Sequence, residues 1–253
     1  MERNPLIVVS SRLDRVTPDG RGSSCEDSAP SIITAWRRAE EADVGNTIVD
    51  CHDASLADAV RDAGGYSVTS DPTEIPPTHN YKPPSGLARI ARTITRFDRF
   101  CNHDLIIHMP EHYADIDAKY LRALMYPLAS NDVGMATLAA PLPAEADEQA
   151  PKISVRWNED RMVHVMPEAK VGTIRDFSRD AARLNAGEIC AHIPVYIYRR
   201  SVLDRMVLVP PSDRELEESI EALRVLEIGR RADALFVPEG MPASMEDDRA
   251  IYD

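Results

Sequence analysis

This chain of 253 residues has few cysteines, no long apolar runs and no excess of positive charge. Each of these absences excludes a class of protein. The four cysteines, Cys25, Cys51, Cys101 and Cys190, lie far apart, without the close pairs that typify zinc modules or small disulfide-linked domains. We therefore expect reduced thiols and a single domain stabilised by a hydrophobic core.

The charge balance excludes a second class of protein. The 29 basic and 42 acidic residues leave a net charge of −13, which would repel phosphates over most of the surface. We expect neither a nucleic acid nor a membrane as partner, although local basic pockets stay open. No segment approaches the roughly 20 apolar residues of a membrane-spanning helix, and the N-terminal apolar stretch is too short for a signal peptide. These absences predict a soluble, cytoplasmic protein.

Buried-strand patterns alternate with amphipathic helical patterns up to residue 140. This order predicts parallel strands joined by right-handed crossovers, in an open, doubly wound α/β sheet. The predicted strands are 5–10, 47–51, 66–69, 104–108 and 133–140, and the predicted helices are 31–41, 55–63, 85–100 and 117–128.

The pattern changes after Pro151. Alternating residues at 152–157 and 161–165 flank Asn158-Glu159-Asp160, which predicts an antiparallel hairpin with its turn at these three residues. We expect one domain over 1–253, with 151–199 as an inserted arm. The remaining predicted elements are strands at 193–198 and 232–237, a helix at 213–228 and a short helix at 245–252.

Two segments interrupt the regular rhythm. Residues 17–30 are rich in Gly, Ser and Asp, which suits a loop that faces phosphates and suits an ordinary solvated loop equally well. Residues 70–84 contain five prolines, too many for an element that needs backbone donors. We expect this second segment to project or to be partly disordered.

Four segments together match one protein family. They are Asp62-Ala-Gly-Gly65, Val133-Gly-Met-Ala-Thr-Leu-Ala139, residues 196–199 and the acidic stretch 215–226. Through them the chain resembles the CMP-Kdo synthetases, the 3-deoxy-manno-octulosonate cytidylyltransferases, over nearly its full length. The resemblance implies a Rossmann-like nucleotidyltransferase fold, with an open, mostly parallel sheet and an inserted antiparallel arm that forms a homodimer. It also implies a reaction in which a sugar-acid hydroxyl attacks the α-phosphorus of CTP and expels pyrophosphate.

The resemblance places the nucleotide beside two short segments. Ser11-Arg12 and Gly20-Arg21 stand where the family has Ala-Arg and Gly-Lys, so it implies that these four residues bind the triphosphate and that both arginines act in catalysis. The alternative is two surface arginines on a loop, and Asp19 puts an acid where the triphosphate would lie.

A third segment, at the start of the predicted helix 85–100, matches less well. Ser85, Gly86 and Arg89 correspond to the family's Ser-Gly-Thr segment and its following arginine. The resemblance implies nucleotide binding by all three, since a helix N-terminus can approach a nucleotide closely. An ordinary N-cap is the alternative.

The family's metal-binding carboxylates are replaced. His112, in Pro110-Glu111-His112-Tyr113-Ala114, stands where the family has a metal-binding Asp, and the second Asp of the family falls at Ser244, within 243–248. Magnesium prefers hard oxygen ligands in octahedral geometry, so an imidazole and a hydroxyl are poor substitutes. A role for Mg²⁺ stays open only if other carboxylates bind it. Glu111 with Glu246 and Asp247 could restore carboxylates after a small register shift. His108 and His112, with Cys101 and His103, could instead recruit a transition ion, or all could be ordinary loop and core residues.

The acceptor side is altered as well. The family's Ser-Arg pair, which helps to hold the acidic sugar, falls at Met166-Pro167, whereas His192 matches the family's histidine and is implied to be catalytic, as is His112. Glu215, Glu218, Glu221 and Arg224 match the family's acidic helix, and their spacing is typical of a solvated face with ion pairs.

Three hypotheses follow. A divergent cytidylyltransferase would bind CTP or a related nucleotide at the carboxyl ends of the strands and transfer CMP to a small acidic acceptor other than Kdo. A catalytically inactive pseudoenzyme would keep the fold for partner binding or regulation. A nucleotide sensor would use Arg12 and Arg21 without turnover.

Overall fold

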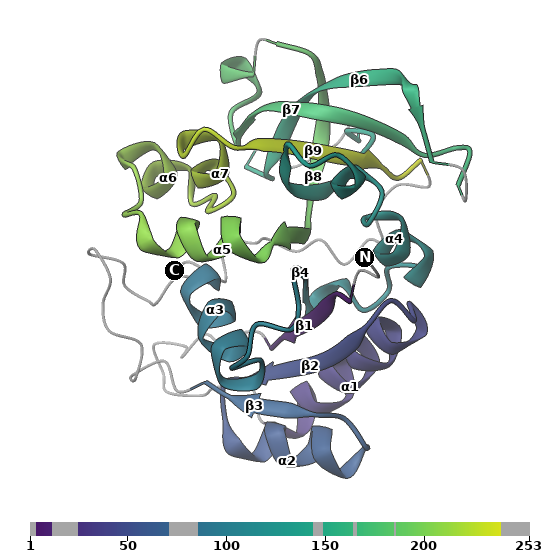
Figure 1. Cartoon of the computed structure of the whole chain (residues 1–253), viewed down its shortest axis with the longest axis vertical. Helices are drawn as coiled ribbons and strands as arrows, with labels where there is room; N and C mark the ends of the chain where they lie inside the picture. Colours follow the sequence, from purple (N-terminus) through teal and green to yellow (C-terminus); the bar gives the residue numbers. More distant parts are fainter. Residues whose placement is uncertain are drawn as a thin grey trace.

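The computed structural model of the protein describes residues 4–11, 25–70, 86–143, 149–163, 166–184 and 186–238 (Figure 1). The predicted loop 70–84, apart from Ser70, and the predicted helix 245–252 lie outside these ranges. The strands are β1 (Leu6–Ser10), β2 (Asn46–Cys51), β3 (Ser67–Thr69), β4 (Leu105–Pro110), β5 (Val133–Ala140), β6 (Lys152–Met162), β7 (Lys170–Ser178), β8 (Glu188–Arg199) and β9 (Arg231–Phe236). The helices are α1 (Cys25–Glu41), α2 (Ala54–Asp62), α3 (Gly86–Phe97), α4 (Ala118–Ala123), α5 (Arg200–Leu208), α6 (Asp213–Glu218) and α7 (Leu223–Glu227), with 3₁₀ turns η2 (Glu111–Tyr113), η3 (Pro127–Ala129) and η4 (Ala181–Arg183).

The first part of the chain forms the expected parallel sheet. Strands β3, β2, β1 and β4 lie side by side in that order, all parallel, as the alternation of strands and helices predicts. The α/β Rossmann-like fold is thereby confirmed. Strand β8 then lies antiparallel between β4 and β5, and β5 pairs in parallel with β9.

The later strands close on themselves. Beyond β9 the sheet continues through β7 to β6, and β6 also pairs with the first residues of β8, at 188–191. Strand β8 is long enough to do both, because its later residues pair with β4 and β5. Figure 1 shows β6 and β7 arching over β8 and β9, away from the parallel strands.

Both faces of the parallel strands are covered. Ile7, Val9 and Ile107 point toward α1, α2 and α4, whereas Leu6 and Val8 point toward α3, α5 and α7. A strand buried on both faces reads as a continuous apolar run, which explains the sequence of β1. No helix in the described ranges is long and apolar enough to cross a membrane.

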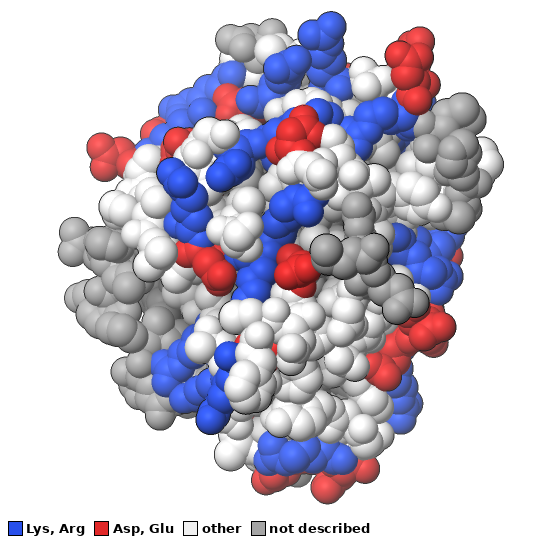
Figure 2. All heavy atoms as spheres, viewed as in Figure 1, with Lys and Arg blue, Asp and Glu red and all other residues white. Residues whose placement is uncertain are grey.

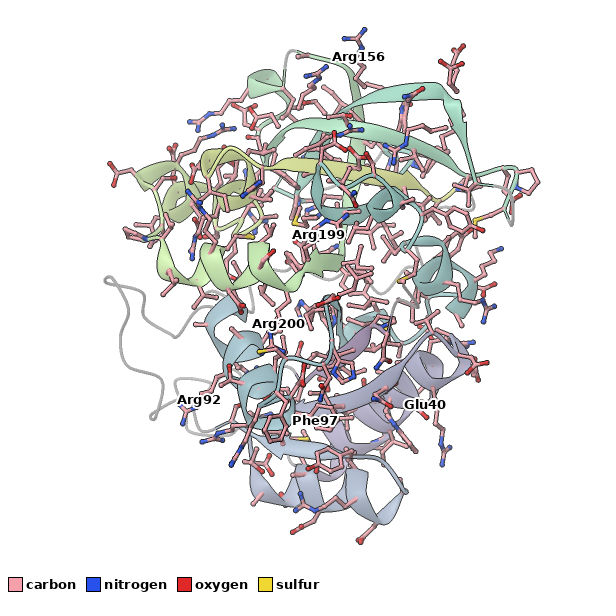
Figure 3. All side chains as sticks on the ribbon, viewed as in Figure 1. Glu40, Arg92, Phe97, Arg156, Arg199 and Arg200 are labelled. Atoms are coloured by element: carbon pink, nitrogen blue, oxygen red, sulfur yellow. The ribbon has the colours of Figure 1, made fainter. Side chains whose placement is uncertain are left out.

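Two adjacent arginines connect β8 and α5 to the turn before β5 and to the end of α3 (Figure 3). The guanidinium of Arg199 donates to the backbone carbonyls of Leu128, Ser130 and Val133 at 2.8–2.9 Å. Arg200 donates to Asp98, at the end of α3, at 2.6 Å. Because buried carbonyls and carboxylates need donors, these contacts hold the start of α5 in place.

Figure 2 shows basic and acidic side chains interspersed over the face that it presents, most densely over the part of the molecule that carries β6 to β9. Several are paired, as in Arg231 with Asp132 at 2.7 Å and Arg214 with Asp176 at 2.8 Å. Exposed pairs of this kind contribute little stability singly.

The predicted hairpin turn at Asn158-Glu159-Asp160 is wrong. Strand β6 runs through these residues, and its partner β7 lies further along, at 170–178, where no strand was predicted. The segment has no glycine to provide the positive φ of a two-residue turn, and a register shift between Asn158 and Met162 absorbs the polar residues instead. The close approach of the strands occurs at Gly172, where a Cβ atom would lie 2.5 Å from Val155 Cγ1.

Several predicted helices have different bounds. The predicted helix 213–228 is two helices, α6 and α7, separated at Ser219, whose φ of 51° lies in the left-handed region. The predicted helix 117–128 ends at Ala123, before Pro127. Helix α1 begins at Cys25, in the predicted loop, and α5 was not predicted. The long helix was predicted from a simple periodicity of polar and apolar residues. The polar side chains around Ser219 turn inward, so this periodicity does not describe one helix with a polar outer face.

Candidate functional site

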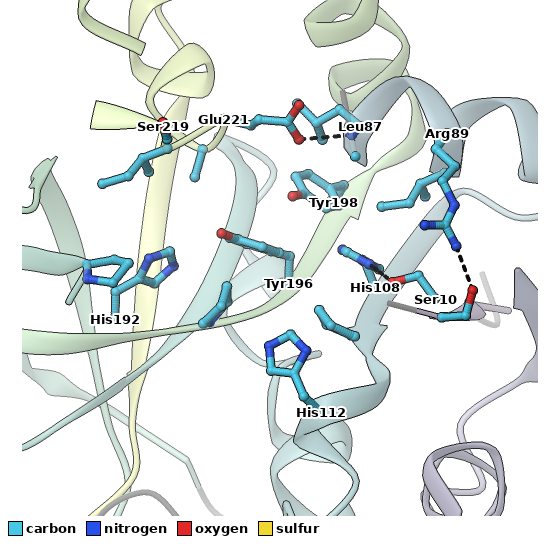
Figure 4. A pocket seen from close by; sticks show the side chains of 18 of the residues that line it. Ser10, Leu87, Arg89, His108, His112, His192, Tyr196, Tyr198, Ser219 and Glu221 are labelled. Atoms are coloured by element: carbon cyan, nitrogen blue, oxygen red, sulfur yellow. Dashed lines mark hydrogen bonds between the residues drawn. The ribbon is translucent and has the colours of Figure 1, made fainter. Parts of the chain in front are cut away.

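A pocket that is open to solvent lies at the carboxyl ends of β1 and β4 (Figure 4). The start of α3, the middle of β8 and residues 219–222 form its other walls. This is the end of an open α/β sheet at which ligands bind. Of the predicted site residues in the described ranges, Ser11, Gly86, Arg89, His112 and His192 line the pocket, and Glu111 is buried between Pro110 and His112. Arg12, Gly20, Arg21, Ser85, Glu246 and Asp247 lie outside those ranges.

Arg89 is held by a buried carboxylate. Its guanidinium forms an ion pair with Asp50 and donates to Ser11 Oγ at 3.0 Å and to the Asp50 carbonyl at 3.1 Å. Thr93 Oγ1 donates to the same carboxylate at 2.8 Å. A buried arginine is tolerated only when it is paired and hydrogen-bonded in this way. Arg89 therefore stands in a fixed position on the pocket wall, which is compatible with the predicted nucleotide contact and with a structural role.

Ser11 is joined to a second acid through a histidine. Its hydroxyl lies 3.0 Å from His52 Nδ1, and His52 Nε2 lies 3.0 Å from Asp53 Oδ2. Burial acts to raise the pKa of Asp53, but hydrogen bonds, above all from the Leu56 amide, outweigh it and lower the pKa. Ser11 Oγ also accepts from Arg89 and from the His52 amide, so its hydrogen-bonding capacity is filled and it serves as a fixed wall rather than as a nucleophile.

His108 is a neutral imidazole at the centre of the pocket. Its Nε2 lies 2.8 Å from Ser10 Oγ, and its ring stacks on Tyr196 with centroids 6.3 Å apart. Burial, followed by the charges of Arg89 and His112, lowers the pKa of His108 from 6.5 to about 3. At neutral pH the ring is uncharged and can donate or accept one hydrogen bond.

His112 lies beside it in η2, against the ring of Tyr113 at 4.2 Å, and faces the same pocket (Figure 4). The pocket lining in the described ranges has three imidazoles and a single carboxylate, Glu221. Magnesium requires several oxygen ligands in octahedral geometry, and no group of three His, Cys, Asp or Glu in those ranges could hold a metal ion. These donors do not fit Mg²⁺.

The alternative transition-ion group is not assembled either. His103 lies outside the pocket, where its ring is bound to Asp98 at 3.1 Å and to Asn46 at 3.0 Å. Cys101 is exposed on the adjacent turn. His103 is therefore a structural residue, and only His108 and His112 of the predicted group face the pocket.

The acidic stretch is buried, so its interpretation as a solvated face is wrong. Glu215, Glu218 and Glu221 are only 0%, 4% and 7% exposed. Glu215 forms an ion pair with Arg224, and Glu221 accepts from the Leu87 amide at 2.9 Å, at the start of α3. The i, i+3 spacing is the same for a buried and a solvated row, and only the partners on other elements distinguish the two.

Glu218 holds the end of β7 against the pocket. Its two carboxylate oxygens accept from Ser178 Oγ and from the Arg179 amide, each at 2.7 Å. Its carbonyl accepts from Arg179 Nε at 2.7 Å, and Gln149 contributes a second carbonyl to Nη1 at 2.7 Å. The remaining nitrogen, Arg179 Nη2, is buried and has no hydrogen-bond partner among the described residues. A buried donor without a partner in a ligand pocket is suited to an anionic ligand.

Arg179 is a charged pocket residue that the sequence interpretation missed. The Ser-Arg pair expected in the arm was placed at Met166-Pro167, but Met166 is buried in the core, and the Ser-Arg pair of the arm that reaches the pocket is Ser178-Arg179. The pair was visible in the sequence. The error followed from the missing strand β7, without which the arm had no register.

His192 lies on β8 with its ring in the pocket (Figure 4). Its amide donates to the Pro151 carbonyl at 3.1 Å, and its Nε2 lies 3.2 Å from Thr137 Oγ1. The edges of Phe177 and Tyr196 contact the ring, with centroids 5.3 and 5.5 Å away. The ring is therefore fixed on three sides.

Solved structures define the class of protein. The fold is similar to a CMP:2-keto-3-deoxy-manno-octonic acid synthetase complexed with CTP, with a TM-score of 0.69, 21% identity and coverage of 94% of this chain and 92% of that one. It is also similar to a UDP-glucose pyrophosphorylase complexed with UDP-glucose, with a TM-score of 0.58, 12% identity and coverage of 92% and 90%. The chain thus has the fold of the nucleotidyltransferases.

Relatives in sequence define the family. A 3-deoxy-manno-octulosonate cytidylyltransferase of Paramagnetospirillum magneticum is 32% identical, over 99% of this chain and 98% of the relative. The enzyme of that name from Rhodospirillum centenum is 33% identical, over 99% and 94%. No protein-family model matches the chain. The chain belongs to the 3-deoxy-manno-octulosonate cytidylyltransferase family, as its resemblance implied.

The buried glutamates give a stability prediction. Glu215→Gln leaves the Arg224 guanidinium buried without its counter-charge, and loss of one partner of a buried pair costs about 3–5 kcal/mol. Glu217→Gln is the matched control two residues away, in an exposed pair with Arg183 that should contribute below about 1 kcal/mol. Urea denaturation measures both changes in the free energy of unfolding. Equal losses in the two variants would contradict the role assigned to Glu215.

His108 gives a prediction about pH. Its pKa is about 3 in the folded protein and near 6.5 in the unfolded chain, so below about pH 6.5 the unfolded state binds a proton that the folded state does not. His108 therefore lowers stability progressively as the pH falls from 6.5 toward 3. In His108→Asn the free energy of unfolding should fall less steeply between about pH 7 and 4.5 than in the unmodified protein. Parallel slopes in urea denaturation series would refute this.

Proposed function

We propose that this protein binds CTP or a closely related nucleotide in the pocket and transfers CMP to a small acidic acceptor. One observation carries the proposal: within a chain of the cytidylyltransferase family, two arginines from different elements are fixed in one pocket. Arg89 is held by Asp50, and Arg179 is held by Glu218. Cations set in place before a ligand arrives bind anions without the entropic cost of ordering them.

The nucleotide belongs on the side of β1 and α3. Ser11, Gly86 and Arg89 line the pocket there, at the end of the sheet where open α/β folds bind ligands. The triphosphate would extend toward Arg12, Gly20 and Arg21, and Ser85 would precede the helix. These four roles follow from the resemblance. Transfer forms a bond between the acceptor oxygen and the α-phosphorus as the bond to pyrophosphate breaks, so positioning and charge neutralisation carry the catalysis.

The acceptor belongs on the side of Arg179 and His192. A guanidinium with a free edge binds a carboxylate well, and Arg179 directs only Nε and Nη1 to protein carbonyls. In this proposal, Arg179 supplies the carboxylate-binding cation that the placement of the Ser-Arg pair at Met166-Pro167 had left without a counterpart. 3-Deoxy-manno-octulosonate, the substrate in the relatives' name, is therefore the first acceptor to test.

A second candidate function is nucleotide binding without turnover, in a pseudoenzyme or sensor. The observation that favours it is His112, an imidazole that faces the pocket where the resemblance implies a metal-binding carboxylate. In either function, one domain over 1–253 with an arm at 151–199 and a homodimer is what the resemblance implies, and we retain these as proposals.

Isothermal titration calorimetry of the full chain with CTP, with and without Mg²⁺, tests nucleotide binding, and UTP and ATP serve as controls. We expect CTP to bind at least tenfold more tightly than ATP, which corresponds to about 1.4 kcal/mol. A strong gain from Mg²⁺ would show that carboxylates outside the described ranges complete a metal site. Pyrophosphate release with 3-deoxy-manno-octulosonate then separates an enzyme from a sensor. Absence of binding by every nucleotide would overturn the proposal.

Arg179→Lys tests the acceptor side. Lysine keeps the charge but loses the forked geometry, so acidic-acceptor affinity should fall by about 10- to 100-fold, as expected for a hydrogen bond to a charged group. The affinity for CTP should stay within about twofold. Arg175→Lys, on β7 four residues before Arg179 and exposed, is the control. Acceptor affinity unchanged in Arg179→Lys would contradict the assignment.

A further inference from the structure

We infer that Thr137 is a positioning residue that fixes His192 in a single tautomer, with hydrogen on Nε2, so that Nδ1 is a hydrogen-bond acceptor for the hydroxyl of the acceptor substrate. The tautomer follows from the contacts of Thr137 alone. The role of Nδ1 rests on the proposed function and deepens it, because it names a group for the hydroxyl beside the carboxylate bound by Arg179.

The pairing of β5 with β8 is irregular after Thr137. Thr137 is paired with Tyr196, but the next residue, Leu138, is paired with Ile193, so Pro194 and Val195 are extra residues on β8. Proline has no backbone donor, and a bulge leaves ladder groups without partners. The carbonyls of Ile193 and Val195 are instead satisfied by the Thr137 hydroxyl, at 2.8 and 3.0 Å.

The hydroxyl has one hydrogen and three close neighbours. Both carbonyl oxygens are acceptors, so the hydrogen of Thr137 is directed to them. The third neighbour is His192 Nε2 at 3.2 Å, and the hydroxyl can only accept from it. Nε2 must therefore carry a hydrogen. A neutral imidazole carries one ring hydrogen, so Nδ1 is an acceptor. Thr137 is fully buried, so solvent water does not replace these contacts.

The imidazole of His192 cannot easily rotate to exchange the positions of Nδ1 and Nε2. The rings of Phe177 and Tyr196 pack against it, with centroids 5.3 and 5.5 Å away, and the His192 amide is bound to the Pro151 carbonyl. Figure 4 shows the ring on the pocket wall, on the same side as Tyr196. A ring held by packing and by a hydrogen bond on one nitrogen presents the other nitrogen in a defined direction.

In the reaction, His192 Nδ1 can accept the proton of the acceptor hydroxyl. As the acceptor oxygen forms its bond to the α-phosphorus, its hydrogen passes to His192 Nδ1, and the electron pair of the breaking bond leaves with pyrophosphate. The resulting imidazolium keeps its hydrogen bond from Nε2 to Thr137. The arrangement is that of a general base oriented by a third group.

Nitrogen-15 NMR of the full chain tests the tautomer without any ligand. The chain has seven histidines, so two-bond proton–nitrogen correlations of a histidine-labelled sample can be resolved, and loss of one set of signals in His192→Gln assigns the ring. We expect the pattern of a protonated Nε2 and an unprotonated Nδ1 at neutral pH. The opposite pattern, or averaged nitrogen shifts, would overturn the inference.

Variants of Thr137 test the role. Thr137→Val removes the hydroxyl and should yield averaged His192 shifts, with pyrophosphate release from CTP and 3-deoxy-manno-octulosonate lowered by about 10²-fold in kcat, as for loss of general-base catalysis. The KM for CTP should change by less than about twofold. Thr137→Ser keeps the hydroxyl and should restore both the tautomer and most of the rate. Thr173→Val, on β7, controls for the change of side chain.

The outcomes separate the two proposals. If Thr137→Val does not fold, the NMR pattern of the unmodified protein and of Thr137→Ser still decides the tautomer. A protein that shows the expected tautomer but binds no nucleotide removes the proposed function, and with it the role of Nδ1. A protein that turns over CTP equally well in Thr137→Val and Thr137→Ser keeps the proposed function and refutes the positioning role.

Discussion

The buried carboxylate of Glu218 is the interaction on which the pocket depends most. It binds Ser178 and the Arg179 amide, and its own carbonyl binds the Arg179 side chain, so one residue joins α6 to the end of β7. Charge-assisted hydrogen bonds gain strength away from water. Glu221 acts in the same way on the start of α3. A row of acids that resembles a surface helix in sequence thus connects the later part of the fold to the parallel sheet.

Arg89 and Arg179, the two arginines of the pocket, are both held in position by contacts with other elements. Each is held by an acidic residue of another element and is oriented before a ligand enters. The guanidinium of Arg89 is paired with the buried Asp50 carboxylate, whereas the Arg179 backbone amide donates to the Glu218 carboxylate and the Arg179 guanidinium donates to the Glu218 carbonyl. His108 between them is kept neutral by burial and by the nearby charge of Arg89. The described part of the pocket therefore combines fixed cations with the neutral imidazole of His108, which suits an anionic ligand and differs from a carboxylate site for magnesium.

Prediction from sequence succeeded where the physical signal is local and failed where it depends on a distant partner. The parallel strands were recognised because a strand covered on both faces is a continuous apolar run, and β5 was predicted with its observed bounds, Val133–Ala140. The hairpin failed because Asn158-Glu159-Asp160 has turn composition, whereas β6 is held extended by pairing with both β7 and β8. That error moved the expected Ser-Arg pair to Met166 and concealed Arg179.

By itself, the sequence determined the α/β class, the parallel strands, the family and some of the residues that line the pocket, such as Arg89 and His192, because each rests on a local pattern or a short motif. Tertiary structure alone decided that the acidic row is buried, that Arg179 reaches the pocket and that Thr137 orders His192. Burial and hydrogen-bond partners join residues far apart in the chain. Thr137 and His192, for example, meet only because β5 and β8 pair across a bulge, and no spacing in the sequence records that meeting.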